Sequence, residues 1–335
     1  MSKYNESSEI FNLVNSANNI LIIQADNPDG DSLGSSLALE QILGDLGKDP
    51  SMYCGIEIPS YLRYLKGWDR VSNELPKSID LTIIVDCNSL SLLETLSKNN
   101  HISRLSSKPV IVLDHHAIDV SLPFATIVCN QIAASTGEVI YELAKDLNWP
   151  LNLTAKQMIS TSILSDSLGL ISESTTARTI RIIAELVDSG VKLGELEEAR
   201  RELMKKSPEL IKYKGLLLQR IEYYLNNSVA MITIPWEEIE KYSQSYNPSM
   251  LVIDDMRLTE ETKIAIAFKV YKDGKITAKI RSNYGYPVAA EFAKHFGGNG
   301  HPYASGFKLN KADKDIDAVK LECIKVLEEL LKKYK

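Results

Sequence analysis

The fold is decided by a stretch near the N-terminus, Ile20-Leu21-Ile22-Ile23-Gln24-Ala25-Asp26-Asn27-Pro28-Asp29-Gly30-Asp31-Ser32. Its first four residues form a continuous apolar run, which is typical of a buried strand. A polar loop follows. The spacing then predicts a helix over about 32–46, because apolar residues recur at helical intervals and Gly47 stands where a C-cap is expected. A buried strand leading into a helix is the repeating unit of an α/β fold.

The same pattern continues through the first half of the chain. Buried strands are predicted at 81–85 and 110–113, with a further candidate at 124–129, and helices at about 134–147 and 154–164. Continuous apolar strands separated by helices indicate a parallel sheet that is covered on both faces. We therefore predict the α/β class, with a parallel-sheet domain at the N-terminus.

The second half of the chain changes character. Residues 175–225 have a helical, charged pattern that is typical of a solvated connecting segment. Strands are predicted at 229–234, 263–271 and 275–282, and the last two flank the hairpin signal Lys272-Asp273-Gly274. Helices at 288–295 and 314–331 complete a smaller α+β domain. The predicted division is a first domain at 1–190, a helical linker at 191–210 and a second domain at 211–335.

Composition limits the classes of protein and of partner. A length of 335 residues suits about two domains. The 44% of hydrophobic and 24% of charged residues exclude wholesale disorder. The net charge of −6 has the wrong sign for a protein that coats long nucleic acid, but it is compatible with a short nucleotide in a local basic pocket.

Cysteines and apolar runs indicate where the protein works. The cysteines show no CxxC spacing, so we expect free thiols in a reducing compartment; they are Cys54, Cys87, Cys129 and Cys323. No apolar run approaches the roughly 18 residues of a membrane span. Residues 1–10 also lack the basic and then apolar pattern of a secretory signal. We therefore expect a cytoplasmic protein with no membrane partner.

Acidic and imidazole side chains follow three of the predicted strands. The first strand leads to Asp29 and Asp31, the second to Asp86, and the third to Asp114-His115-His116. Taken singly, each is as well explained by a cap or a turn. Because the carboxyl ends of parallel strands meet at one edge of a sheet, their repetition predicts that they converge. Asp166, which follows an apolar helix, is a further member.

Converging carboxylates predict a bound cation, because they repel one another unless a cation neutralises them. Carboxylates with imidazole suit Mn²⁺ or Mg²⁺ better than structural Zn²⁺, which prefers thiolates. The one-residue separation of Asp29 and Asp31 lets each reach a different ion. Two ions about 3.5–4 Å apart form a clamp for phosphoryl displacement. We therefore predict two divalent ions, Mn²⁺ or Mg²⁺.

In this order, the motifs resemble those of the DHH phosphoesterases. The resemblance rests on Asn27-Pro28-Asp29-Gly30-Asp31, then Asp86, then Asp114-His115-His116, then Asp166. The later segment Gly297-Gly298-Asn299-Gly300-His301-Pro302-Tyr303-Ala304-Ser305-Gly306, preceded by Arg281-Ser282, is similar to the signature of their DHHA1 domain. Within the superfamily, the combination looks most like the oligoribonuclease and pAp phosphatase group. The resemblance covers about residues 20–307.

The resemblance implies a set of metal ligands. Two ions would share Asp86, and Asp29 would bind the first of them. The other ligands of the second ion would be Asp31, His115 and Asp166. His116 would face the phosphate as a catalytic group, and Asp114 would orient the ring of His115 through a hydrogen bond. The metals would lower the pKa of a bridging water, which would attack phosphorus in line.

One position departs from the family pattern. The family usually has a histidine ligand of the first ion where this chain has Ala25, and alanine cannot coordinate a metal. Three alternatives stay open. The first ion binds more weakly, or a water, Asp26 or Gln24 takes the histidine's place, or one ion alone stays bound.

The glycine-rich segment of the second half would bind the substrate. The resemblance implies that Arg281, Ser282 and His301 grip the terminal nucleotide or its phosphate. Glycines let backbone N–H groups approach an anion, and those concerned are Gly297, Gly298 and Gly300. No Lys-Ser/Thr follows them, so the segment is not a P-loop, and a plain turn is the bland alternative. Tyr284, Tyr286 and Tyr303 are candidates for base stacking, although most tyrosines simply pack.

The predicted function is therefore that of a metal-dependent phosphoesterase acting on short RNA or DNA oligonucleotides, linear dinucleotides or 3′-phosphoadenosine 5′-phosphate. A manganese-dependent inorganic pyrophosphatase is an alternative, although Gly297 to His301 argue against it. A single-strand exonuclease is a weaker one, because the chain has no obvious basic track. A nucleotide-binding protein without catalysis, marked by Ala25, is an alternative of another class. A homodimer is left open.

Overall fold

A computed structural model describes residues 3–116, 120–310 and 315–334 of the chain. The chain divides into two compact units, Met1–Lys205 and Lys206–Lys335. The first unit holds a parallel sheet and the second a mixed sheet, with helices in the segment that joins them. The predicted fold class is confirmed. Among the helices that the structure describes, none has both the length and the apolar character needed to cross a bilayer.

The first unit is built on six parallel strands in the order β3-β2-β1-β4-β5-β6. The strands are β1 (Asn19–Ile23), β2 (Asp49–Tyr53), β3 (Val71–Ser72), β4 (Leu81–Val85), β5 (Val110–Asp114) and β6 (Ile127–Asn130). The chain runs outward from β1 to β3 and then returns to the other side of β1. The strand order therefore reverses between β1 and β4, and ligands of open α/β sheets bind outside the carboxyl ends of the strands at such a point.

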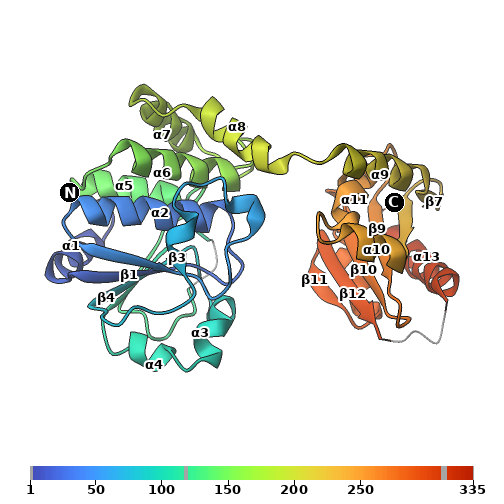
Figure 1. Cartoon of the computed structure of the whole chain (residues 1–335), viewed down its shortest axis with the longest axis horizontal. Helices are drawn as coiled ribbons and strands as arrows, with labels where there is room; N and C mark the ends of the chain where they lie inside the picture. Colours follow the sequence, from blue (N-terminus) through green and yellow to red (C-terminus); the bar gives the residue numbers. More distant parts are fainter. Residues whose placement is uncertain (1–2, 117–119, 311–314, 335) are drawn as a thin grey trace. The chain divides into compact units, whose positions relative to one another are not determined.

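Helices cover both faces of this sheet, as Figure 1 shows. One face packs against α1 (Ser7–Ser16), α2 (Gly30–Asp45), α5 (Thr136–Asp146) and α6 (Leu153–Asp166), and the other against α3 (Glu94–Lys98) and α4 (Ile102–Leu105). Ile20 and Ile22 belong to the first core, whereas Leu21 and Ile23 belong to the second. Two buried faces explain why the strand reads as a continuous apolar run. The unit also contains α7 (Ala177–Asp188), α8 (Leu193–Met204) and three short 3₁₀ helices, Ser60–Leu62, Trp68–Arg70 and Leu90–Leu93.

Two strands of the first sheet were not predicted. Residues 81–85 are the fourth strand in chain order rather than the second, because β2 and β3 precede them. In β2, with the sequence Asp-Pro-Ser-Met-Tyr, only Met52 and Tyr53 are buried. The two residues of β3 pair with these same two positions. An apolar run of two residues is too short to form a recognisable strand pattern.

The second unit is built on a mixed sheet in the order β11-β12-β10-β9-β8-β7. The strands are β7 (Glu222–Tyr224), β8 (Val229–Ile234), β9 (Ile264–Val270), β10 (Ile276–Ser282), β11 (Asn299–His301) and β12 (Ala304–Leu309). Strands β8 and β9 are parallel and the other neighbours are antiparallel. The strand at 229–234 and the hairpin around residues 272–274 are confirmed.

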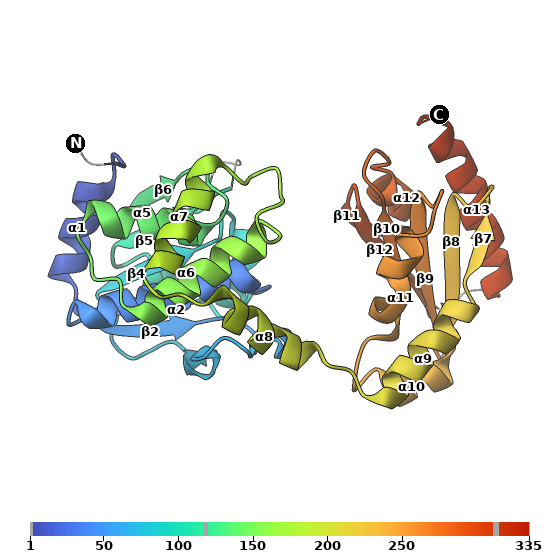
Figure 2. The same ribbon diagram turned by 90° about the horizontal axis from the view of Figure 1, so that it is seen from above.

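Helices also cover the second sheet on both sides (Figure 2). One face packs against α9 (Pro208–Gln219), α10 (Trp236–Tyr242) and α11 (Pro248–Arg257), and the other against α12 (Ala289–His295) and α13 (Ile316–Lys332). Residue 314, where the sequence predicts the start of the final helix, lies outside the described residues.

The glycine-rich segment is a tight hairpin rather than a loop. Residues Asn299–His301 form β11, which pairs with β12. A Cβ atom added to Gly298 would lie 2.2 Å from the carbonyl oxygen of Gly306, and Gly300 has φ of +141°. Both positions therefore need glycine to let the two strands approach, whatever else they do.

Candidate metal centre

Four predicted ligands meet beyond the carboxyl ends of β1, β4 and β5. The Nε2 atom of His115 lies 3.4 Å from Oδ2 of Asp31 and 3.5 Å from Oδ1 of Asp86. The same atom lies 3.2 Å from Oδ2 of Asp166, the last residue of α6. This nitrogen is buried and makes no hydrogen bond within the described part of the chain. One imidazole nitrogen thus faces three carboxylates.

Asp31 is held in place by a dense set of donors. It is fully buried in the first turn of α2 and accepts hydrogen bonds from the backbone N–H of Thr136 at 2.8 Å, from Ser162 Oγ at 2.6 Å and from Ser35 Oγ at 2.9 Å. Burial and the neighbouring Asp86 carboxylate raise the pKa of Asp31 well above its usual range. Sequence reasoning missed these donors. The helix-start signal at Ser135 and Thr136 could have indicated one of them.

Asp86 stands in an unusual backbone conformation. Its φ is +53°, in the left-handed region that non-glycine residues seldom adopt. The residue directly follows β4, and the hydroxyl of Thr136 lies 3.4 Å from its Oδ1 atom. A sparsely populated conformation persists only where the surrounding structure fixes it, and such residues cluster at functional sites.

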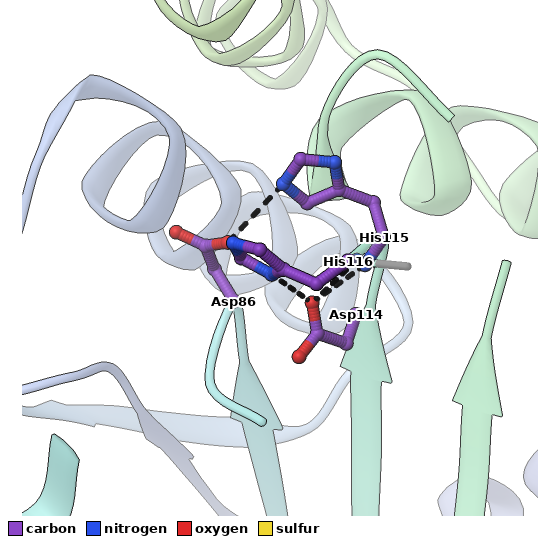
Figure 3. A group of neighbouring side chains, drawn as sticks. All are labelled: Asp86, Asp114, His115 and His116. Atoms are coloured by element: carbon purple, nitrogen blue, oxygen red, sulfur yellow. Dashed lines mark hydrogen bonds and ion pairs between the residues drawn. The ribbon is translucent and has the colours of Figure 1, made fainter. Parts of the chain in front are cut away.

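Asp114 orients His116 rather than His115, which corrects the predicted role (Figure 3). Its Oδ1 atom accepts the backbone N–H groups of His115 at 2.6 Å and of His116 at 3.1 Å, and lies 2.6 Å from Nδ1 of the His116 ring. The ring of His115 instead places its Nδ1 atom 3.2 Å from the carbonyl oxygen of Ala133. Because the carboxylate caps the two residues after β5, it reaches the second ring and not the first. The Asp114 carboxylate raises the pKa of His116, although burial opposes this.

The side chain of Asp29 caps the N-terminus of α2. It is the N-cap of α2, and its Oδ1 atom accepts the backbone N–H groups of Asp31 and Ser32, each at 3.0 Å. Among the described residues, Asp29 belongs to neither of the two clusters whose side-chain atoms lie close enough together to bind one metal ion. Burial and then the carboxylate of Asp86 nevertheless raise the pKa of Asp29, so the two acids lie close together.

Two polar neighbours of Ala25 remain available as substitute ligands, because both amide atoms of Gln24 and the Oδ1 atom of Asp26 have no hydrogen-bond partner among the described residues. Ala25 is buried in the apolar core that also holds Tyr53 and Leu93. Asp26, one of the alternatives considered, accepts the backbone N–H of Thr95 at 2.7 Å through its Oδ2 atom. Gln24 is fully buried. In the described structure, Asp26 therefore binds a backbone N–H group in the first turn of α3.

The donor set fits a divalent cation. Two overlapping groups could hold an ion, Asp31 with His115 and Asp166, and Asp86 with Asp114, His115 and His116. Burial opposes protonation of His115, but the carboxylates of Asp166 and Asp86 raise its pKa to about 11. The carboxylates around Nε2 of His115 repel one another unless this nitrogen carries a proton or a cation binds between them. Carboxylate oxygens with one imidazole suit Mn²⁺ or Mg²⁺.

The second unit brings some of its predicted residues together and separates another. His301 of β11 pairs with Ala304, which pairs with Arg281 of β10, so the side chains of His301 and Arg281 lie on one face of the sheet. Ser282 lies on the opposite face, where it is buried and donates its hydroxyl to the carbonyl oxygen of Pro302 at 3.2 Å. Ser282 thus supports the hairpin turn and does not share the face of Arg281.

Sequence comparison agrees with this fold and site. Residues 19–169, which span β1 to the end of α6, match the DHH family, N-terminal domain. The first unit therefore contains a DHH family N-terminal domain, and the resemblance to the DHH phosphoesterases predicted from the motifs is confirmed.

The relatives extend along most of the chain. It is 24% identical over 311 residues to the bifunctional oligoribonuclease and PAP phosphatase NrnA of Bacillus subtilis, covering 91% of this chain and 94% of the relative. An exopolyphosphatase-related protein from Bacteroides fragilis superposes with a TM-score of 0.79 at 21% identity, over 98% of this chain and 96% of that one. Exonuclease RecJ bound to manganese superposes with a TM-score of 0.53 at 15% identity, over 96% and 94%.

Proposed function

We propose that this protein is a divalent-metal-dependent phosphoesterase that hydrolyses short oligonucleotides, linear dinucleotides or 3′-phosphoadenosine 5′-phosphate. One observation carries the proposal. The buried, unpartnered Nε2 atom of His115 faces the carboxylates of Asp31, Asp86 and Asp166 at 3.2–3.5 Å. The name of the B. subtilis relative supports the substrate class, and that of the manganese-bound exonuclease supports the metal.

The residues of the first unit have distinct parts in this reaction. Asp31, Asp86, His115 and Asp166 would hold the metal, with Asp29 available beside them. A bound divalent ion lowers the pKa of a coordinated water and offsets charge on the phosphate. Asp31 is fixed by Thr136 and Ser162 before any substrate arrives, which limits reorganisation during the reaction. His116 is held by Asp114, and its partly exposed ring is placed to donate a proton or a hydrogen bond to a phosphate oxygen.

The second unit would bind the nucleotide. Arg281 can form a forked pair with a phosphate, and the exposed His301 shares its face of the sheet. Gly297, Gly298 and Gly300 shape the hairpin that carries His301, and Ser282 anchors its turn. We assign recognition of the terminal phosphate to Arg281 and His301.

The test is a turnover assay on the full chain. Purified protein is incubated with a labelled diribonucleotide or 3′-phosphoadenosine 5′-phosphate in Mn²⁺, in Mg²⁺ or in EDTA, and products are separated chromatographically. We expect metal-dependent release of mononucleotide or phosphate and none in EDTA. Absence of turnover with every divalent ion, while the melting temperature shows a folded protein, would contradict the proposal.

A nucleotide-binding protein without catalysis is the second candidate, and Ala25 is the observation that favours it. The variant Ala25→His separates the two, with its folding checked by thermal melting because Ala25 lies in a packed core. Activity that appears only in the variant would identify the native protein as a binder. Turnover by the native protein, with a changed metal preference in the variant, would identify an enzyme.

A further inference from the structure

On one face of the second sheet, the half formed by β10, β12 and β11 is only partly buried, and α11 reaches it only at β10 in the described structure. On β8 and β9, this face is buried, and Ala265 and Ala267 pack with residues of α9 to α11. On β10, the residues that point the same way are only partly buried, whereas Ile276, Ala278 and Ile280 between them are buried on the other side. The strand register fixes this alternation.

The strand register arranges the residues of this open half-face in three rows across the sheet, and Figure 1 shows the strands that carry them. Paired residues of neighbouring strands point to the same side. The three rows are His301-Ala304-Arg281, Asn299-Gly306-Lys279 and Lys308-Thr277-Lys269. Ala304 and Gly306 have small or no side chains, so the centre of this face is partly exposed to solvent.

The cations of these rows lack acidic partners. The ion pairs of the second unit join other residues, and none of the described acids lies within ion-pair distance of Lys269, Lys279 or Arg281. Asp254 on α11 is the nearby acid, and it acts on both Lys279 and Arg281. Burial and then Lys279 lower the pKa of Lys269, and burial and then Arg281 lower the pKa of Lys279. Neighbouring like charges without counter-ions are costly to keep unless an anion binds them.

An exposed aromatic pair stands at the end of the same strand. Tyr284 follows β10 and Tyr303 occupies the turn between β11 and β12; they are 85% and 38% exposed. Their rings are nearly parallel, with an angle of 15° and centroids 6.3 Å apart. Nucleic-acid bases stack on such exposed rings, at about 1–3 kcal/mol per base.

We propose that the cations Arg281, Lys279 and Lys269 of this half-face, together with the tyrosine pair at the end of β10, bind a single strand of several nucleotides. A base stacks on the tyrosines and successive phosphates lie along the cations. Alternate residues of β10 are about 7 Å apart along the strand, so Arg281 and Lys279 serve different phosphates. Lys279 and Lys269 then determine substrate length, because a single nucleotide held at Arg281 does not reach them. The inference rests on the proposed function for the choice of a nucleotide ligand.

Binding of a fluorescently labelled five-nucleotide RNA to the full chain tests the inference. Fluorescence anisotropy is measured in EDTA, which prevents hydrolysis, across 50–200 mM salt. The variant Lys269→Ala/Lys279→Ala should bind about tenfold more weakly, and its slope of log affinity against log salt should fall by about 1.4 because two phosphate contacts are lost. Tyr284→Ala should weaken binding about tenfold with no change in slope, because stacking releases no counter-ions.

Two comparisons sharpen the result. Lys294→Ala removes an exposed lysine from α12, which packs on the opposite face of the sheet, and should change affinity less than twofold. Adenosine 3′,5′-bisphosphate, which spans one nucleotide, should bind the double lysine variant and the wild type within twofold of each other. Equal affinity and slope in the wild type and the double variant would overturn the inference, and so would an equal loss in Lys294→Ala.

Failure of this inference and failure of the proposed function give different results. If the wild type hydrolyses a dinucleotide with Mn²⁺ but the lysine variant binds RNA normally, the binding surface is refuted and the function stands. If the RNA binds through these lysines and no substrate is hydrolysed with any metal, the function is refuted and the surface stands.

Discussion

The two units carry opposite charge. The first, Met1–Lys205, has 17 basic and 27 acidic residues, a net charge of −10, and the second, Lys206–Lys335, has 21 basic and 17 acidic residues, a net charge of +4. The overall charge of −6 hides this difference. In the first unit, acids converge at one edge of a parallel sheet, where a cation is needed. In the second, cations line one open half of a mixed sheet, where an anion is needed.

The two charged sites also differ in how rigidly they are held. Asp31 is fully buried and accepts hydrogen bonds from Thr136 of α5, Ser162 of α6 and Ser35 of its own helix, so its position is fixed before a ligand binds. Lys269 and Lys279 are partly exposed side chains with no such partners in the described structure. Chemistry that needs accurate geometry suits the first site, whereas a flexible polyanion suits the second.

The largest effect is expected from removing a shared acid of the first unit. Asp86→Asn should lower the kcat for dinucleotide hydrolysis about a thousandfold, or about 4 kcal/mol, because the bound metal loses a charged ligand. RNA binding in EDTA, assigned to the second unit, should be unchanged. Asp188→Asn, at an exposed acid of α7, is the matched control. Full activity in Asp86→Asn would remove the site from the mechanism.

Metal addition should stabilise the first unit. The proposed metal site exists only in the folded chain, so Mn²⁺ at about 100 times its Kd should add about 2.7 kcal/mol of stability. Calorimetry should show a rise in the Tm of the wild type and a smaller rise in His115→Asn. A titration that gives equal shifts in both proteins would place the ion elsewhere.

Glu142 is an acid of the first unit that lies outside the candidate metal centre and forms ion pairs instead. This buried carboxylate pairs with Lys3 and Arg178 and accepts a hydrogen bond from Tyr4 at 2.8 Å. Burial opposes its ionisation, but Lys3 and then Arg178 hold the pKa of Glu142 below its usual value. Glu142→Gln should cost about 2 kcal/mol of unfolding free energy at pH 7 without changing metal affinity.

The pH dependence of this contribution follows from the direction of the shift. Because the folded pKa of Glu142 lies below the unfolded value, its contribution is complete above about 4.5 and is lost as the pH falls further. The unfolding free energies of the wild type and Glu142→Gln, measured in urea, should therefore differ at pH 7, and the difference should shrink as the pH falls below about 4.5. A difference that does not change with pH would mean that the ion pairs do not stabilise the fold.

The smallest effect is expected at Arg281. Arg281→Ala should raise the KM for a dinucleotide about tenfold, about 1.4 kcal/mol, with little change in kcat, because a forked phosphate contact is lost in ground and transition states alike. Arg281→Lys should recover only part of this affinity, since lysine cannot form the fork. A fall in kcat with unchanged KM would instead place Arg281 among the groups that act on the reacting phosphate.

The main buried strands of both units, and the polar residues that follow three strands of the first, could be predicted from the sequence. Asp86 and the Asp114-His115-His116 triplet could be found because continuous apolar runs are long enough to recognise and their last residues are easily read. The sequence could not reveal β2 and β3, since β2 has only two buried residues and β3 is only two residues long with neither of them buried. It also assigned Asp114 to the wrong ring, because the path of the chain after β5 is not encoded in spacing.

Only the tertiary structure decided which groups share a surface. Thr136 and Ser162 lie 105 and 131 residues from Asp31, and packing of α5 and α6 against α2 is what brings them to its carboxylate. Side chains alternate along β10, and only the packing of its two faces decided that Lys279 and Arg281 lie on the open half-face and Ser282 on the buried side. Local propensity acts over a few residues, whereas hydrogen bonds and charge interactions depend on distances that the whole fold sets.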